Sequence, residues 1–197
     1  EGTTFYHPEL KFRFTYPAGW QYQNQPTQVN MAPQDGKALL VFTLSGQKTL
    51  QAAADSTIAQ LGLTLQSRRS ITVNGLPAIT TTSQQVLQDQ NTGAKAVNMV
   101  LSYFIQLDNY FYVFHGVSTE ADFAAYLNPL ESTMKTFARL TDQSKINVKP
   151  NKLLVRRVQR AGTLADAFAY YGVKQEMRDE LALLNDMELT DKVQVGK

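Results

Sequence analysis

Apolar and polar residues alternate through the first part of the chain. In "LKFRFTY" (residues 10–16) every second residue is apolar, and "PAG" then ends the pattern. A repeat of two residues predicts a β-strand with one buried face. The same pattern recurs in residues 28–33 and 38–44, and Asp35-Gly36 between them is a favoured hairpin turn. This part of the chain therefore predicts three strands.

The pattern becomes helical after residue 48. In residues 50–61 apolar side chains recur every three or four positions, with Thr49 as the predicted N-cap and Gly62 as the C-cap. The face predicted to pack on the sheet consists of Leu50, Ala54, Thr57, Ile58 and Leu61. A hairpin is predicted next, in which residues 64–73 and 76–87 flank the turn Asn74-Gly75.

The most apolar segments lie in the second half of the chain. Residues 94–107 have apolar side chains on one face, whereas residues 110–117 are apolar on both, which predicts a central strand covered on both sides. Residues 119–140 have a helical pattern that Asn128-Pro129 is expected to break or kink. The order of strands and helices predicts an α+β domain, with helices packed on one mainly antiparallel sheet. Its predicted core contains Phe12, Phe14, Ile58, Leu101, Tyr103 and Val113.

Candidate chemistry rests on few residues, because the chain has two histidines and no cysteine. His7 and Glu9 stand two residues apart, but a zinc site needs three or four ligands and no second histidine lies near them. Pro8 favours a different interpretation, in which this segment is the turn into a strand. His115 lies in the predicted central strand, and we interpret it as a buried neutral histidine hydrogen-bonded to a neighbour rather than as a general base.

Composition and charge exclude further classes of function. The 197 residues are 43% hydrophobic, which suits one ordinary globular domain and a small second one. A formal net charge of +2 is too small to indicate nucleic-acid binding, and the lack of cysteine excludes disulfides, thiol catalysis and cysteine zinc sites. No apolar run approaches the ~20 residues of a membrane span. The start "EGTTFYHPE" has neither an initiator Met nor a signal-peptide core, so we expect a piece of a longer protein.

A family resemblance follows from the order of these segments. The chain has "LKFRFTYPAGW" at the start, "NGLPA" in the mid-chain hairpin, and "YFYVFHGVSTEADF" with "LESTMKTF" towards the end. Together these resemble the PsbP-like α/β/α sandwich over about residues 5–140. The resemblance implies a first domain at 1–140 that serves as a binding or assembly module rather than as a catalyst.

The composition shifts after this domain. Residues 141–151 are polar, contain Pro150 and predict a linker. No acidic residue lies between Asp142 and Asp166, and the basic residues in that stretch are Lys145, Lys149, Lys152, Arg156, Arg157 and Arg160. One interpretation is a solvated basic linker and strand face. The alternative is a basic surface, with Arg156, Arg157 and Arg160, that contacts an anionic polymer or the acidic side of a partner.

The last segment, residues 152–197, predicts a strand before Gly162, a helix capped by Thr163, a second helix over 175–189 and a second strand in 191–197. This order, with "GTL" at 162–164, "LALLN" at 181–185 and "VQVGK" at 193–197, resembles the LysM module. The resemblance implies a small βααβ domain. The family usually has Asp where this chain has Gly162, and its final strand would follow "VGK". We expect this domain to bury its apolar residues, namely Leu154, Leu164, Phe168 and Leu184, only in part.

Taken together, the PsbP-like and LysM-like parts resemble the C-terminal accessory region of bacterial zinc-dependent proteases, which are envelope-associated H-E-x-x-H metallopeptidases of the gluzincin class. The resemblance implies a periplasmic or cell-envelope location and a protein partner, substrate or peptidoglycan as the contact. It also implies that zinc belongs to the catalytic domain of the parent protein. Neither His7 nor His115 stands in an H-E-x-x-H motif, so this chain is expected to be non-catalytic and to hold no cofactor.

The LysM resemblance also implies a site. In that family N-acetyl sugars lie between the turn after the first strand and the loop after the second helix, which correspond here to Gly162, Thr163 and Leu164 and to Asp186, Met187, Glu188 and Leu189. Neither loop contains an aromatic residue, and Glu188 would repel the carboxylates of a peptidoglycan stem. We therefore expect weak glycan binding and favour protein contact. Two other hypotheses remain: a structural dimerisation scaffold, and an independent hydrolase, for which no G-x-S-x-G motif is present.

Overall fold

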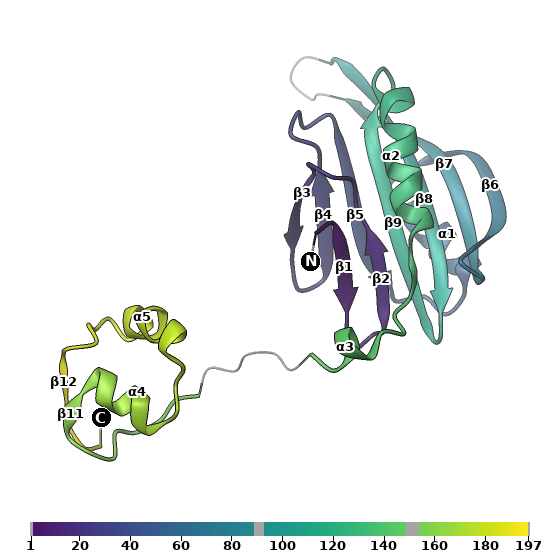
Figure 1. Ribbon diagram of the computed structural model, residues 1–197. Helices are drawn as coiled ribbons and strands as arrows, with labels where there is room; N and C mark the ends of the chain where they lie inside the picture. The colour runs from purple at the N-terminus through teal and green to yellow at the C-terminus, as the bar shows by residue number, and fades with distance from the viewer. Residues whose placement is uncertain (1, 89–92, 149–153, 197) are drawn as a thin grey trace. The chain divides into compact units, whose positions relative to one another are not determined.

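The computed structural model describes residues 2–88, 93–148 and 154–196, which divide into two compact units, Glu1–Val148 and Lys149–Lys197 (Figure 1). Part of the predicted linker is ordered, because Gln143–Ile146 form the short helix α3, in which the Asp142 carboxylate accepts a hydrogen bond from the Ser144 backbone N–H (2.9 Å). Residues 149–151 of that linker lie outside the described residues. In the described part of the chain, no helix is long and apolar enough to cross a membrane.

The larger unit is built on a seven-stranded antiparallel sheet with the order β3-β4-β5-β9-β8-β7-β6 (Figure 1). Its strands are β3 (Gln21–Asn24), β4 (Gln28–Ala32), β5 (Ala38–Ser45), β6 (Thr64–Val73), β7 (Leu76–Gln88), β8 (Lys95–Leu107) and β9 (Tyr110–Thr119). The predicted α+β class with a mainly antiparallel sheet is confirmed. The predicted central strand is also confirmed, since β9 lies between β5 and β8.

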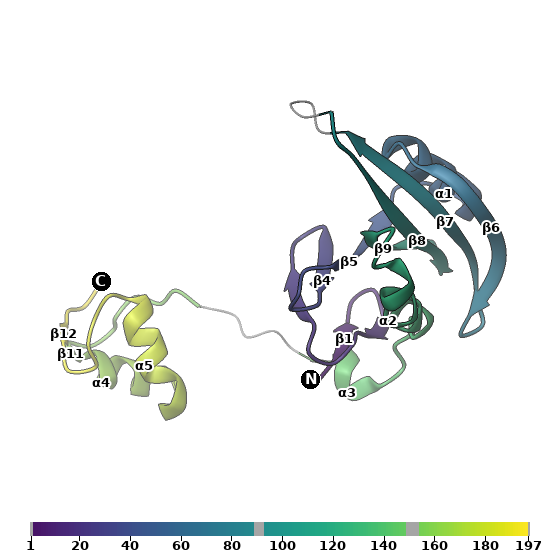
Figure 2. The same ribbon diagram turned by 90° about the horizontal axis from the view of Figure 1, so that it is seen from above.

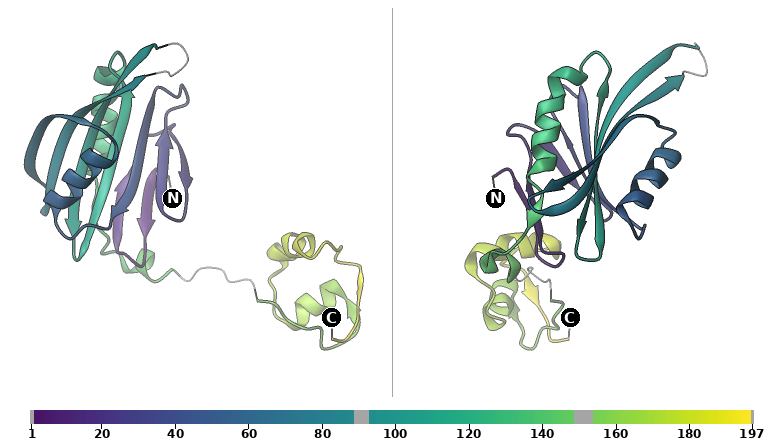
Figure 3. Two further views of the ribbon diagram at one scale, coloured as in Figure 1. Left: turned by 180° about the vertical axis from the view of Figure 1, so that it is seen from behind. Right: turned by 90° about the vertical axis from the view of Figure 1, so that its right-hand side faces the viewer.

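Both faces of this sheet are covered, which explains why β9 is apolar on both sides. Helix α1 (Leu50–Gln60) covers one face, where Ala53 and Ala54 pack with Val113 of β9. Helix α2 (Phe123–Lys135) lies on the opposite face, where Leu130 and Met134 join the larger core. Figures 2 and 3 show the two helices on opposite sides of the sheet. The arrangement is the predicted α/β/α layering.

A second, three-stranded sheet covers part of the α2 side. It has the order β1-β2-β10 and consists of β1 (Thr4–His7), β2 (Phe12–Thr15) and β10 (Ala138–Arg139). The prediction of a single sheet is therefore wrong. Phe12 and Phe14 of β2 are buried, as predicted, but their ring contacts with Phe42 join them to the large sheet by packing rather than by strand pairing.

The two predicted helices need corrections at their faces and ends. Thr49 caps α1 as predicted, since its side chain accepts a hydrogen bond from the backbone of the helix, but Leu61 is 43% exposed and Ile58 only partly buried. The chain continues in α2 through Pro129 without a break. We attribute this continuity to the burial of the next residue, Leu130, which offsets the backbone hydrogen bond that proline cannot donate.

Helix α2 is also shorter than the predicted 119–140. It starts at Phe123 because Thr119 still pairs with β8. After it ends at Lys135, Phe137 enters the core and the next two residues pair with β2. The side-chain amide of Asn74 donates to the backbone carbonyls of Lys135 and Phe137, at 2.9 Å each, and so satisfies groups at the helix end.

The smaller unit has the predicted βααβ order. It consists of β11 (Gly162–Thr163), α4 (Leu164–Tyr170), α5 (Gln175–Leu184) and β12 (Lys192–Val193). The prediction of a strand before Gly162 is wrong for the described residues 154–161, since β11 starts only at Gly162. Leu154 of this segment is 68% exposed. Leu164 is buried, Phe168 is partly buried and Leu184 is 61% exposed, which agrees with the expected partial burial of this unit's apolar residues.

Candidate functional site

The structure brings together the two segments of the predicted groove. Residues 162–164 form β11 and the start of α4, and residues 186–189 form the turn after α5. The backbone N–H of Ala165 donates to the carbonyl of Leu189 at 3.0 Å, which fixes one segment against the other. The predicted neighbourhood therefore exists.

Most apolar side chains of this groove pack into the hydrophobic core of the smaller unit. Leu164 is 6% exposed, and Met187 and Leu189 are partly buried against the same core. Asp186 and Glu188 are exposed. The groove thus presents carboxylates where a sugar would need a flat apolar surface. Its part in glycan or partner binding stays a prediction.

Asp166 holds Thr163 by hydrogen bonds and lies close to Gly162. The backbone N–H and the hydroxyl of Thr163 both donate to Asp166 Oδ2, at 2.9 and 2.7 Å, and the Asp166 N–H donates to Thr163 Oγ1 at 3.2 Å. The backbone bond and then the hydroxyl hold the pKa of Asp166 below its usual value. A Cβ at position 162 would lie 3.0 Å from Asp166 Oδ2. A side chain at position 162 would therefore crowd the Asp166 carboxylate.

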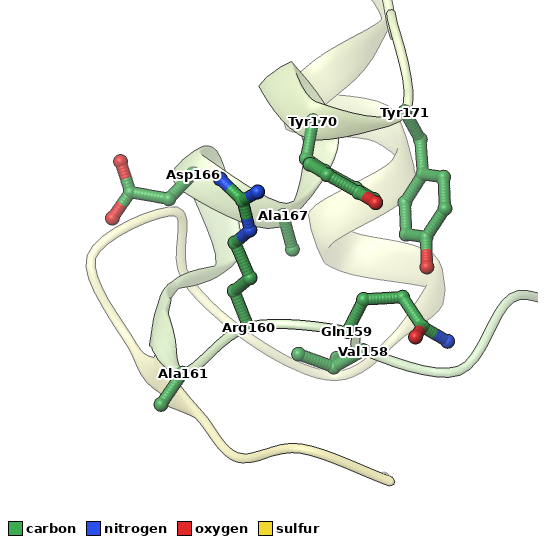
Figure 4. A pocket seen from close by; sticks show the side chains of 8 residues that line it. All are labelled: Val158, Gln159, Arg160, Ala161, Asp166, Ala167, Tyr170 and Tyr171. Carbon is green, nitrogen blue, oxygen red and sulfur yellow. The ribbon is translucent and has the colours of Figure 1, made fainter.

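A cleft of about 340 Å³ opens on another side of α4 (Figure 4). One wall is the extended segment 158–161, and the other is formed by α4 and its C-terminal end. The residues that line it are Val158, Gln159, Arg160, Ala161, Asp166, Ala167, Tyr170 and Tyr171. The volume lies at the lower end of the ~300–1,000 Å³ typical of ligand sites. It suits a few side chains of a partner or a small molecule.

Aromatic and basic side chains meet in this cleft. The guanidinium carbon of Arg160 lies 5.3 Å from the centre of the Tyr170 ring, which is a cation–π contact. The Tyr171 ring packs edge to face against Tyr170, with ring centres 5.0 Å apart. The Tyr171 hydroxyl donates to the carbonyl of Arg157 at 2.5 Å. These contacts tie the extended segment to the end of α4 and give the cleft a defined wall.

The predicted basic surface lies beside this cleft. Arg156, Arg157 and Arg160 are all exposed in the extended segment. Lys149 and Lys152, which belong to the same predicted basic stretch, lie outside the described residues. Of these three arginines, only Arg160 lines the cleft, where its side chain lies against Tyr170. The acidic residue in the same lining is Asp166. The cleft is thus an amphipathic site with a cation on one wall.

His115 behaves as the sequence predicts. Its Nδ1 lies 2.8 Å from the hydroxyl of Ser102 on the neighbouring strand, and burial lowers the pKa of His115 to about 4. Ser102 is 1% exposed. A serine closed off from solvent cannot attack a substrate, so this pair is a structural hydrogen bond. The predicted hydrogen bond to a neighbour is present, and the His115 side chain is partly buried.

His7 is the last residue of β1, and its Nδ1 accepts a hydrogen bond from the Leu10 N–H at 3.2 Å. The segment from His7 to Leu10 is therefore a turn into β2, as predicted.

In the described residues, no group of three or more His, Asp or Glu side chains has an arrangement that could hold a metal ion. The larger unit also has a crevice of about 90 Å³ beside β1, which is lined by Phe5, Phe12 and Phe42 among others.

Sequence reasoning found Arg160 but missed Tyr170 and Tyr171. The sequence contains one sign of this wall. Ala167 and Tyr170 are three residues apart, so they lie on the same face of a helix that ends before Gly172. What could not be read from the sequence is the path of residues 158–161, which have no regular pattern and yet form the opposite wall.

Comparison with known proteins places the fold. No family model matches the chain, and no curated protein matches it. Among solved structures, it is similar to cyanobacterial PsbP (CyanoP) from Synechocystis sp. PCC 6803, with a TM-score of 0.54 and 14% identity over 69% of this chain and 91% of that chain. The Ran-binding protein Mog1p from Saccharomyces cerevisiae has a TM-score of 0.46 and 13% identity over 71% of this chain and 96% of that chain. LpqN, involved in cell envelope biogenesis of Mycobacterium tuberculosis, has a TM-score of 0.46 and 8% identity over 64% of this chain and 82% of that chain.

The likeness to CyanoP confirms the predicted PsbP-like fold. It includes the large antiparallel sheet with helices on its two faces. At 14% identity the likeness concerns the fold alone, and function must be argued from the residues of this chain.

Proposed function

We propose that this chain is a non-catalytic binding and positioning region of a bacterial cell-envelope zinc metallopeptidase. It brings the peptidase to a protein partner or substrate in the periplasm or envelope. Zinc and the catalytic residues belong to the catalytic domain of the parent protein. The observation that carries the proposal is the open cleft of the smaller unit, where Arg160 and Tyr170 form a preorganised contact surface on a unit separate from the PsbP-like one.

The features of the two histidines support binding over hydrolysis. A hydrolase needs a nucleophile that a substrate can reach and a base beside it. Ser102 and His115 are within hydrogen-bonding distance, but Ser102 is buried on the face of the sheet that α1 covers. His7 is engaged in a turn. The cleft contains a cation, two phenols and a carboxylate that is already hydrogen-bonded, which suits recognition.

The runner-up function is a peptidoglycan anchor that uses the LysM-like groove. Protein contact is favoured over it because Leu164, Met187 and Leu189 pack into the core of the unit. The exposed groove residues Asp186 and Glu188 would also repel the carboxylates of peptidoglycan stems.

Affinity capture from bacterial envelope extract tests the proposal. The bait is the full chain, and the matched control is a chain that ends at Val148 and keeps the PsbP-like unit. We expect mass spectrometry to identify an envelope zinc peptidase, or its substrate, on the full chain and in much smaller amount on the control. Equal capture by both baits, or capture of neither class of protein, contradicts the proposal.

A second measurement addresses the hydrolase hypothesis directly. The purified chain should contain no stoichiometric zinc and should not cleave a casein or peptide-library substrate. Turnover that a chelator abolishes would show that this chain is itself an enzyme.

A further inference from the structure

The arginine in the cleft keeps its hydrogen-bonding edge available. The guanidinium of Arg160 contacts the Tyr170 ring, with 5.3 Å between the guanidinium carbon and the ring centre. A guanidinium carries five N–H donors, and among the described residues none of those of Arg160 donates a hydrogen bond to another group of the chain. Among the described residues, no carboxylate forms a salt bridge with Arg160. This wall is therefore prepared for an acceptor that comes from outside.

The carboxylate nearest to this cation in the lining is directed elsewhere. Asp166 Oδ2 already accepts hydrogen bonds from the backbone N–H and the hydroxyl of Thr163. Figure 4 shows the Asp166 carboxylate pointing away from Tyr170 and Tyr171, on the far side of Arg160. Arg156, exposed in the same extended segment, adds positive potential near the cleft. The open part of the cleft is thus favourable for a negative group.

The same contacts disfavour a sugar. A pyranose needs an open, flat aromatic or apolar face, and the face of Tyr170 is covered by the guanidinium of Arg160. Tyr171 is fixed by its hydroxyl, which donates to the Arg157 carbonyl at 2.5 Å, and by its edge-to-face contact with Tyr170. The tyrosines therefore act as walls beside a cation.

We propose that this cleft binds an acidic segment of a protein partner. A Glu or Asp carboxylate of the partner accepts two parallel hydrogen bonds from the free edge of Arg160, and a neighbouring apolar side chain packs between Val158 and Tyr171. The proposal rests on the binding role argued above and names the class of ligand for that site. An anionic partner also gives the exposed arginines of the extended segment a role in steering.

The test uses the full 197-residue chain and defined probes. The first probe is a blocked heptapeptide of alternating Glu and Leu, the second is the same peptide with Gln for Glu, and the third is tetra-N-acetylglucosamine. Binding is followed by NMR, on the Arg160 side-chain Nε–H and the backbone signals of Tyr170 and Tyr171, at low and high salt. We expect the Gln peptide to bind at least tenfold more weakly than the Glu peptide, since a hydrogen bond to a carboxylate is stronger than one to a neutral amide.

Variants separate the cleft from general charge. Arg160→Gln should weaken the Glu peptide tenfold or more, and Arg160→Lys should recover part of the loss because it restores the charge without the planar fork. Lys174→Gln removes the same charge from an exposed residue that does not line the cleft, and should bind as the unmodified chain does. A well-dispersed spectrum for each variant checks that the unit is folded.

Three results overturn the proposal: equal binding of the Glu and Gln peptides, equal loss for Arg160→Gln and Lys174→Gln, or cleft signals that move with the sugar and not with the acidic peptide. The last result would favour a glycan anchor. The failure of the proposed function has a different signature, because it is the loss of peptidase or substrate capture by the full chain. If the peptide experiment fails while capture persists, only the acidic ligand class is wrong.

Discussion

Mild acid should destabilise this protein through His115. The residue lies on β9, on the sheet face that α1 covers, and it shares a hydrogen bond of 2.8 Å with Ser102. Burial lowers the pKa of His115 from 6.5 to about 4. The folded protein therefore keeps this ring neutral at pH values at which the unfolded chain already protonates it.

The sign and size of the effect follow from this difference. Between pH 6.5 and about 4 the unfolded chain binds more protons than the folded one, so the free energy of unfolding falls as the pH falls through this window. The contribution is complete above pH 6.5 and lost near pH 4. At about 1.4 kcal/mol for each pKa unit, the lowered pKa corresponds to about 3 kcal/mol. This is an upper value, because the side chain keeps some contact with solvent.

Urea unfolding at a series of pH values from 7.5 to 4.5 measures the loss. The variant His115→Gln keeps a hydrogen-bonding partner for the Ser102 hydroxyl but cannot titrate, so its stability should be lower at neutral pH and nearly flat over this window. His7→Gln removes the other histidine and is the matched control. The carboxylates with lowered pKa, such as Asp55 and Asp108, lose their contributions around and below pH 4. If His115→Gln loses as much stability as the unmodified protein, the reasoning fails.

Three other perturbations test the packing. Gly116→Ala places a Cβ 2.9 Å from Leu130 Cδ2 and should cost about 1–3 kcal/mol of unfolding free energy, whereas Gly46→Ala, with open space around its Cβ, should be nearly neutral in the same urea assay. Val113→Ala should cost about 2–5 kcal/mol, and an unchanged melting temperature would contradict its place in the core between β9 and α1. Residues 149–197 expressed alone should show at most a weak, broad unfolding transition by circular dichroism; a sharp transition at high temperature would contradict the small core assigned to this unit.

The strands of the large sheet were predictable because their signals are local. Alternation fixes which side chains of a strand are buried, and turns such as Asn74-Gly75 fix the pairing of its neighbours. Both residues of that turn have positive φ, 49° and 80°, the conformation that a two-residue hairpin loop requires. Residues 110–117 are apolar on both faces, which predicted a central strand. The structure explains this pattern, because each face of β9 packs into a different hydrophobic core.

The missed elements depend on distant partners. Strand β10 is two residues long and pairs with β2, so that Ala138 lies opposite Arg13, more than a hundred residues earlier in the chain. No local pattern distinguishes these residues from the end of α2, and the helical prediction ran through them. The short strand β1 escaped for the same reason, since it exists through its pairing with β2. The predicted strand before Gly162 failed because its partner β12 is itself two residues long.

The candidate site was predictable only in its charges. Arg160 was predicted because basic residues cluster in the sequence, but its cation–π partner Tyr170 lies on a helix, and Arg160 itself lies on an irregular segment. The LysM resemblance pointed to a different pair of loops, and the structure places these loops together. The cleft lies on another side of α4 and depends on the side chains of Arg160, Tyr170 and Tyr171.

The small core of the second unit links its stability to its ligand. Its buried residues are Leu164, Ala182 and Val193, while Leu183 at the end of α5 is 79% exposed. A unit with so little buried apolar surface has a small free energy of unfolding. A ligand that binds only the folded unit adds RT ln(1 + [L]/Kd), which is about 2.7 kcal/mol at a hundred times Kd. The cleft lies between α4 and the extended segment 158–161, so the proposed partner would hold together two parts of the unit. We therefore expect partner binding to raise the stability of this unit.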